Sequence, residues 1–223
     1  MAQNAAGVVP MSIHMLRVAR AASAIALIAL TAVDAFAQNP PGGRGGGGRG
    51  GGGGRGRGGV RVMTLTSNGF ADGASMPAKF TQAGEERSPQ LSWTGGPDSA
   101  ASYVLLVHDA DAATGNGTDD VVHWLVWNIP GGATQLPEGV PQGPQLPDGT
   151  RQISVSGPYY RGPAAPATGP PHHYVFELFA LDTMLDIAPT GAAPAATRAA
   201  VMTAMAGHVR GKAVMVALYR RQP

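Results

Sequence analysis

The chain has 223 residues, enough for one domain of ordinary size or two small ones. Its 16 Lys and Arg residues against 14 Asp and Glu residues give a formal net charge of +2, which points to no strongly charged partner. The absence of cysteine from these residues excludes disulfides, thiolate metal ligands, a cysteine nucleophile and a lipid-modified cysteine at a cleavage site.

The first 37 residues have the order of regions typical of a secretory signal peptide. A short basic stretch at 15–20 precedes a mostly apolar run at 21–33, and Ala35-Phe36-Ala37 provides an A-x-A cleavage site. The apolar run is shorter than the about 20 residues that a transmembrane helix needs. We therefore predict a signal peptide over 1–37, with Met11 or Met15 as alternative starts, and an exported protein, periplasmic or secreted, without a transmembrane span after cleavage. A buried or amphipathic helix and an uncleaved membrane anchor are the alternatives.

Residues 38–59 are dominated by glycine and arginine. The segment 42–59 holds fourteen glycines and four arginines and contains no apolar side chain that could build a core. This composition predicts a disordered linker, with a contact to a cell-envelope polyanion as the alternative. An RNA-binding tail fits poorly, because no aromatic residues are interleaved and a signal peptide precedes it, so we expect no nucleic-acid partner.

Residues 60–223 form the predicted domain and carry 10 Lys and Arg against 13 Asp and Glu. Short apolar runs separated by Gly, Pro, Asn and Asp predict a mainly β domain with strands at 62–66, 91–93, 103–108, 121–129, 174–181 and 212–219. An Ala- and Met-rich run predicts one helix over 198–206, before the last strand, with Thr197 as N-cap and Gly207 at its end. The Pro-rich stretch 131–171 predicts long loops with one short strand at 152–156.

Candidate functional side chains lie at and near the ends of three of these strands. They are His108, Asp109, Asp111, His123, His172, His173 and Tyr174. Strand alternation places His172 and Tyr174 on one face and His173 on the other, and it places His123 on one face with Leu125 and Trp127. We expect Asp119 and Asp120 to be solvated loop charges. Each histidine alone is also compatible with a hydrogen-bonded structural role.

Four segments are similar, in order and spacing, to the phosphatidylethanolamine-binding protein family. They are SPQLSW (residues 88–93), HDADAA (108–113), VVHWLVWNIPG (121–131) and RGPAAPATGPPHHYVFELFALD (161–182). The closest resemblance is to its bacterial branch, often labelled Raf-kinase-inhibitor-like, and the segment ATRAAVMTAMAGHV also resembles that branch. The resemblance implies a Greek-key β-sandwich-like fold with a small pocket for phosphate-bearing headgroups or similar anions.

The resemblance also implies which residues form the pocket. The motif matches are Asp109, Asp111, His123, His172 and Tyr174, with Gly162, Pro163 and Pro166 in a loop that walls the site. Alanine replaces family prolines at Ala110, Ala113 and Ala165, and Val121 stands where an aromatic residue often occurs. The polar residues of the motifs are retained, whereas the shape of the ligand is left open.

Imidazole N–H groups, a tyrosine hydroxyl and loop amides can bind an oxyanion, and an aspartate can orient the histidines. We therefore expect a binding protein for a small anionic ligand or a phospholipid headgroup, without a cofactor and without enzymatic activity. Two histidines and a carboxylate also make a metal-dependent hydrolase an alternative. A protein-interaction or inhibitor module that acts on a protein partner through its surface is the other alternative.

Overall fold

The computed structural model describes residues 59–189 and 193–223. The predicted signal peptide at 1–37 and all but the last residue of the predicted linker at 38–59 lie outside the described residues. No helix within the described ranges is long and apolar enough to cross a membrane.

The described chain is mainly β with one α-helix, as the sequence predicts. Its elements are β1 (Arg61–Val62), β2 (Thr64–Ser67), the 3₁₀ turn η1 (Ala78–Phe80), β3 (Leu91–Thr94), β4 (Ser102–Thr114), β5 (Asp119–Pro130), β6 (Gln135–Leu136), β7 (Arg151–Ile153), β8 (His172–Leu181), α1 (Pro194–Met205) and β9 (Val209–Tyr219). The short strand expected at 152–156 is therefore β7, which ends three residues earlier.

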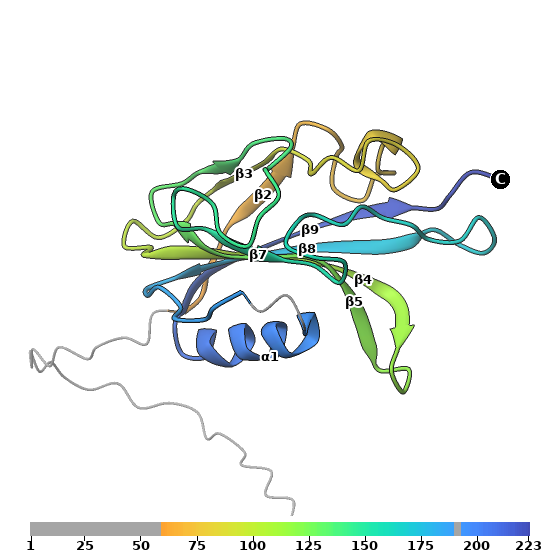
Figure 1. Ribbon diagram of the computed structural model, residues 1–223. Coiled ribbons are helices and arrows are strands. Elements are labelled where there is room, and N and C mark those ends of the chain that lie inside the picture. The colour runs from red at the N-terminus through yellow and green to blue at the C-terminus, as the bar shows by residue number, and fades with distance from the viewer. Residues whose placement is uncertain (1–58, 190–192) are drawn as a thin grey trace, which may run out of the picture. The chain divides into compact units, whose positions relative to one another are not determined.

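Two sheets are stacked on each other (Figure 1). The larger sheet has the strand order β1-β9-β8-β4-β5-β7, and the smaller one has the order β2-β3-β6. All pairings in both sheets are antiparallel except the short parallel pair β1–β9. The four long strands β9, β8, β4 and β5 lie side by side in this order and form the centre of the domain.

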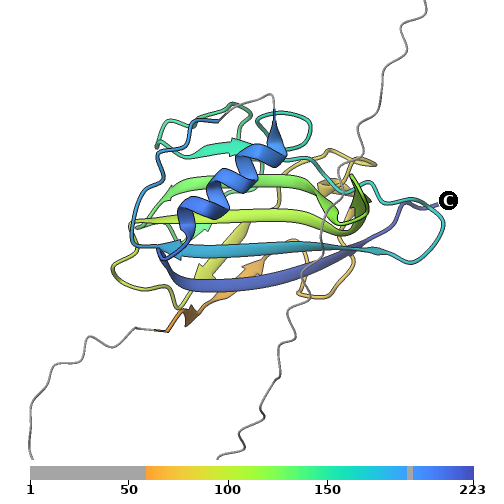
Figure 2. The same ribbon diagram turned by 90° about the horizontal axis from the view of Figure 1, so that it is seen from below.

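Both faces of the large sheet are buried, which explains why its central strands read as nearly continuous apolar runs. One face packs on the small sheet through a core that includes Leu105, Trp124 and Phe176. The other face packs on α1, where Val201 and Met205 join Trp127 in a second core. Figure 2 shows α1 lying across the strands of the large sheet.

Helix α1 begins earlier than predicted. It starts at Pro194 with Ala193 as N-cap, whereas Thr197 lies inside the helix and donates its hydroxyl to the carbonyl oxygen of Ala193, 3.2 Å away. Proline suits the first turn because its missing N–H has no helical partner there and its φ is already helical. Gly207, with φ +83°, follows the helix as expected.

A bulge in β5 overturns the predicted face of His123. Val107 pairs with Trp124, but the next residue of β4 pairs with Val122, so His123 is the extra residue of β5. Leu125 and Trp127 therefore belong to the core under α1, whereas His123 lines a cleft on the opposite face. Regular alternation was the wrong assumption for this strand.

Candidate anion-binding cleft

A cleft of about 370 Å³ opens where β4, β5 and β8 meet the loop that leads into β8. Its lining residues come from four parts of the chain. They are Gln82, Asp109, Ala112, Val121, His123, Val155, Ser156, Arg161, Ala164, Ala165, Pro166, His172 and Tyr174. Most of the polar residues that the sequence singles out thus line a single cleft.

Asp109 and His172 form a pair at the base of the cleft. Nδ1 of His172 lies 2.9 Å from Oδ2 of Asp109 and 3.1 Å from Oδ1. Asp109 is 4% exposed, and its Oδ1 also accepts hydrogen bonds from the backbone N–H groups of Asp111 and Ala112. Since an ionised carboxylate can only accept, Nδ1 of His172 carries the proton and Nε2 is the nitrogen left for a ligand.

His123 is oriented by the backbone of the facing loop. Its Nδ1 lies 2.7 Å from the carbonyl oxygen of Arg161, and the backbone N–H of Arg161 donates to the carbonyl oxygen of His123 at 2.9 Å. A carbonyl accepts only, so Nδ1 is the protonated nitrogen of this ring. Burial lowers the pKa of His123 and the Arg161 charge adds to that effect, although the hydrogen bond to the Arg161 carbonyl oxygen and the Asp109 charge oppose it. The ring is therefore neutral at neutral pH.

Tyr174 forms part of the same wall. Its ring meets that of His123 edge-on, with 5.0 Å between the centroids, and its hydroxyl accepts a hydrogen bond from the backbone N–H of Ala164 at 3.3 Å. Burial and the neighbouring Asp109 carboxylate raise the pKa of the Tyr174 hydroxyl. The hydroxyl therefore keeps its proton and can act as a hydrogen-bond donor.

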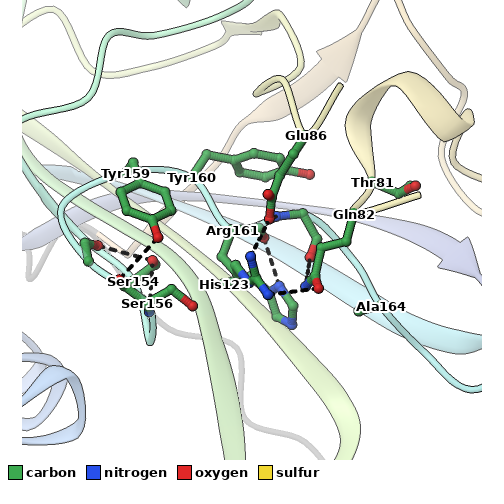
Figure 3. A network of polar contacts seen from close by, with 12 residues as sticks. Thr81, Gln82, Glu86, His123, Ser154, Ser156, Tyr159, Tyr160, Arg161 and Ala164 are labelled. Carbon is green, nitrogen blue, oxygen red and sulfur yellow. Dashed lines mark hydrogen bonds and ion pairs between the residues drawn. The ribbon is translucent and has the colours of Figure 1, made fainter. Parts of the chain in front are cut away.

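Arg161 adds a cation that the sequence reasoning did not single out. Its guanidinium donates to Oε1 of Glu86 at 2.9 Å and to Oε1 of Gln82 at 2.8 Å, while Nε2 of Gln82 donates to the carbonyl oxygen of Gly162 at 2.7 Å. Figure 3 shows the guanidinium next to the His123 ring. Arg161 is the first residue of the motif at 161–182, but its partners Glu86 and Gln82 lie more than 70 residues away in the sequence. The local spacing of residues therefore could not predict these contacts.

The structure does not bring every predicted site residue to the cleft. Pro166 lines it, but Asp111 and Pro163 do not. Oδ2 of Asp111 accepts from the backbone N–H of His173 at 2.5 Å and lies 2.8 Å from its Nδ1, and the backbone bond in particular lowers the pKa of Asp111. The residues Asp111 and His173 thus tie the end of β4 to the start of β8.

Pro163 and Gly162 hold the loop that leads into β8 in place, although they do not line the cleft. The carbonyl oxygen of buried Pro163 accepts from the backbone N–H of Gln82 at 3.0 Å. A Cβ at Gly162 would lie 2.8 Å from the carbonyl oxygen of Phe80, so only glycine fits this approach. Ala165, where the family has proline, is 3% exposed and lines the cleft.

Asp120 is not the solvated loop charge that the sequence suggested. Both Asp119 and Asp120 lie in β5, and the Asp120 carboxylate contacts Nδ1 of His108 at 2.5 Å and the guanidinium of Arg198. Nε2 of His108 lies 3.5 Å from Oε2 of Glu177. This network occupies the face of the sheet under α1, so His108 is not a cleft residue.

No group of three or more His, Asp or Glu residues in the described ranges is arranged to hold a metal ion. The donors around the cleft are paired as Asp109 with His172, and as His123 with a backbone carbonyl. This arrangement offers an anion two imidazole rings, a phenol and a guanidinium.

Comparison with known proteins identifies the family. The sequence profile described as phosphatidylethanolamine-binding protein matches residues 66–220. The chain belongs to the phosphatidylethanolamine-binding protein family. A family relative from Methanothermobacter thermautotrophicus, named UPF0098 protein, is 42% identical over 161 residues, which are 71% of this chain and 99% of the relative. The Escherichia coli UPF0098 protein YbhB is 35% identical over 127 residues, 54% of this chain and 78% of that protein.

Solved structures of the family have the same fold. The phosphatidylethanolamine-binding protein homologue CT736 from Chlamydia trachomatis superposes with a TM-score of 0.60 at 28% identity, over 72% of this chain and 99% of that one. YbcL from Escherichia coli, with 23% identity, gives a TM-score of 0.58 over the same shares. The predicted mainly β family fold is thereby confirmed.

Proposed function

We propose that this protein is an exported binding protein whose cleft binds a small oxyanion, such as the phosphate of a headgroup. The observation that carries the proposal is the convergence of His123, His172, Tyr174 and Arg161 on one cleft of about 370 Å³. The domain has more acidic than basic residues, so an anion would be held by these local groups rather than by the overall charge.

Each of these groups has a chemical part in the proposal. The remaining N–H groups of the Arg161 guanidinium donate hydrogen bonds to the oxyanion, and the Tyr174 hydroxyl donates its single hydrogen to the oxyanion in place of Asp109. Protonation of the His123 or His172 ring adds an N–H donor at Nε2 and a positive charge. Asp109 and the Arg161 carbonyl oxygen hold the two rings in position through their Nδ1 atoms.

The proposal contains a binding step and no catalytic step. Ser154 is fully buried, its hydroxyl donates to the carbonyl oxygen of Gly157 at 3.0 Å, and it accepts from the backbone N–H of Ser156. This serine is therefore not presented to His123 as a nucleophile.

NMR titration of the histidine rings tests the binding step. Phosphate and phosphoethanolamine at millimolar concentration should shift the ring resonances of His123 and His172, while those of His208, which pairs with Asp182 at the protein surface, should stay in place. Unchanged resonances for both cleft histidines would overturn the proposal.

Export is the second part of the proposal. The order of charged, apolar and A-x-A regions in residues 15–37 supports it. A relative from Mycobacterium tuberculosis named "Putative lipoprotein LppC" is 35% identical over 150 residues, 66% of this chain and 69% of that protein, and its name fits an exported protein. Mass spectrometry of the mature protein should find Gln38 as its first residue. A chain that keeps residues 15–37 after expression in its native host would contradict export by this route.

A further inference from the structure

The anion-binding cleft continues past its valine wall into a second hollow. Val121 and Val155 line both the cleft and a hollow of about 270 Å³, so the two spaces adjoin. They meet along the edge of β5, because β7 pairs with β5 only from Leu125 to Trp127. Beyond that point, two backbone bonds cover the edge within the described ranges, from the N–H of Val155 to the carbonyl oxygen of Val122 and from the N–H of Arg161 to that of His123.

The second hollow leads on to a third, next to α1. It shares Thr114, Asp120, Val122 and Ala195 with a hollow of about 450 Å³ that also reaches Met202. Because neighbouring spaces share lining residues, the three adjoin in a row, here called the groove, that runs from the histidines past the edge of β5 to α1.

The middle of this groove has apolar walls. Its lining side chains are Thr114, Asp120, Val121, Val122, Val155, Pro194 and Ala195. The two polar ones already have partners, because the Thr114 hydroxyl donates to the carbonyl oxygen of Asp119 at 3.1 Å and Asp120 is held by His108 and Arg198. These two polar side chains therefore need no hydrogen bond from a ligand.

Exposed apolar side chains mark the same path. Val155 is 51% exposed at its start and Met202 is 38% exposed at its far end, and both are among the few large apolar side chains left exposed in the described ranges. The middle hollow is thus an apolar space beside a polar site, whereas the third hollow is also lined by Thr118, Asp119 and Arg198. An apolar space that opens from a polar site is the shape expected for the binding of a molecule with one polar and one apolar end.

We propose that the groove between the edge of β5 and α1 binds the alkyl arm of an anionic amphiphile whose oxyanion occupies the cleft. The ligand class is a phosphate monoester with an unbranched alkyl chain. Its phosphate lies at His123 and His172, and its chain runs past Val121 and Val155 toward Met202. This inference rests on the proposed function and adds a chain-binding surface to it.

A homologous series of ligands tests the groove on the full chain. Binding of methyl, butyl, hexyl and octyl phosphate is measured by isothermal titration calorimetry. Each methylene that becomes buried should raise the affinity by up to about fourfold, and the rise should end once the chain extends beyond the groove. Equal affinities for methyl and hexyl phosphate would overturn the groove while leaving the proposed function intact. Failure of every phosphate to bind would instead overturn the proposed function.

Two variants locate the chain. Ala195→Glu places a charge in the middle hollow, and Val214→Ser removes an exposed valine on β9, which is three strands away from β5 in the large sheet. The readout is the ratio of the hexyl to the methyl phosphate affinity in each protein, so a general loss of phosphate binding cancels. We expect the ratio to fall by at least about tenfold in Ala195→Glu, because part of the hexyl chain is no longer buried. The ratio should stay within about twofold in Val214→Ser, because this substitution leaves the burial of the chain unchanged. A ratio that Ala195→Glu leaves unchanged would place the alkyl chain elsewhere and overturn the inference.

Discussion

His123 holds its position through two contacts with one residue of the facing loop. Its Nδ1 binds the Arg161 carbonyl oxygen and its own carbonyl oxygen accepts from the Arg161 backbone N–H. The bulge in β5 turns the ring toward the cleft, and bulges are known to re-aim single side chains in this way. The proton on His123 consequently decides whether Nε2 accepts or donates.

Binding of an anion should therefore strengthen as the pH falls. Burial lowers the pKa of His123 below 6.5, so the ring is neutral at neutral pH and gains its charge and its Nε2–H only in mildly acidic solution. Sulfate is a suitable probe because it stays a dianion in this range. Its affinity, followed by NMR from about pH 8 to about pH 5, should rise by about tenfold below the ordinary histidine pKa. The His123→Gln variant should flatten this rise, and an equally steep profile in that variant would rule out His123 as the titrating group.

His172 and His173 provide a matched pair of neighbours. His172 lines the cleft, whereas the His173 side chain is 56% exposed and pairs with Asp111. Loss of one charge-assisted hydrogen bond costs about 1.5–3 kcal/mol, so His172→Ala should weaken phosphate binding by roughly 10- to 100-fold. His173→Ala should change it by less than about threefold, since exposed ion pairs contribute little. Similar losses in both variants, measured by calorimetry, would show that the cleft is not the binding site.

At the residue level, the sequence predicted those cleft residues that a strand pattern or a short motif identifies. Alternation separated His172 and Tyr174 from His173, and the motifs selected Asp109 and His123. The patterns could not show that Asp111 turns to His173, because the two are 62 residues apart. Nor could they show the bulge at His123, since nothing in the run VVHWLVWNI marks an extra residue.

Helix α1 is attached to the large sheet by charged contacts as well as by apolar packing. Arg198 on the helix contacts Asp120 on β5, and Asp120 contacts His108 on β4. Although burial alone would lower the pKa of His108, Glu177 and Asp120 raise it. The alanine-rich sequence predicted the helix, but it suggested Thr197 as the cap, because the favourable place of Pro194 in the first turn was not used.

Removal of the helix cation should loosen α1. In Arg198→Ala, the half-buried Asp120 loses one of its two partners, and we expect the free energy of unfolding in urea to fall by about 1–3 kcal/mol. Arg210→Ala serves as the control, because Arg210 pairs with Asp182 at the surface and the loss of an exposed ion pair should cost clearly less. If both substitutions lower the free energy of unfolding by the same amount, the Asp120 contacts do not stabilise α1 beyond the packing of Val201 and Met205.

The domain as a whole is joined by contacts between distant parts of the chain. Asp109 and His172 are 63 residues apart, and Arg161 and Gln82 are 79 apart. Composition and periodicity predicted the strands, and the family resemblance supplied their arrangement. The small sheet against which the large one packs could not be read from spacing, because β6 has only two residues in the long loop region.

The pH dependence of stability is a property of the whole large sheet, since Glu177 on β8 lies between His108 on β4 and Lys212 on β9. The His108 ring and the Lys212 ammonium, 2.6 Å from Oε1, lower the pKa of Glu177 from 4.5 to about 2. A carboxyl whose pKa is lower in the folded state stabilises the fold above its unfolded pKa, and this stabilisation is lost as the pH falls. We therefore expect the free energy of unfolding to drop by about 1–3 kcal/mol between pH 4.5 and about 2, after allowance for solvent screening. Urea unfolding across this range should show the drop in the wild-type protein and a smaller one in Glu177→Gln, in which the carboxamide does not titrate. A wild-type curve that is flat in this interval, or one that Glu177→Gln reproduces, would mean that the His108–Glu177–Lys212 contacts do not stabilise the sheet.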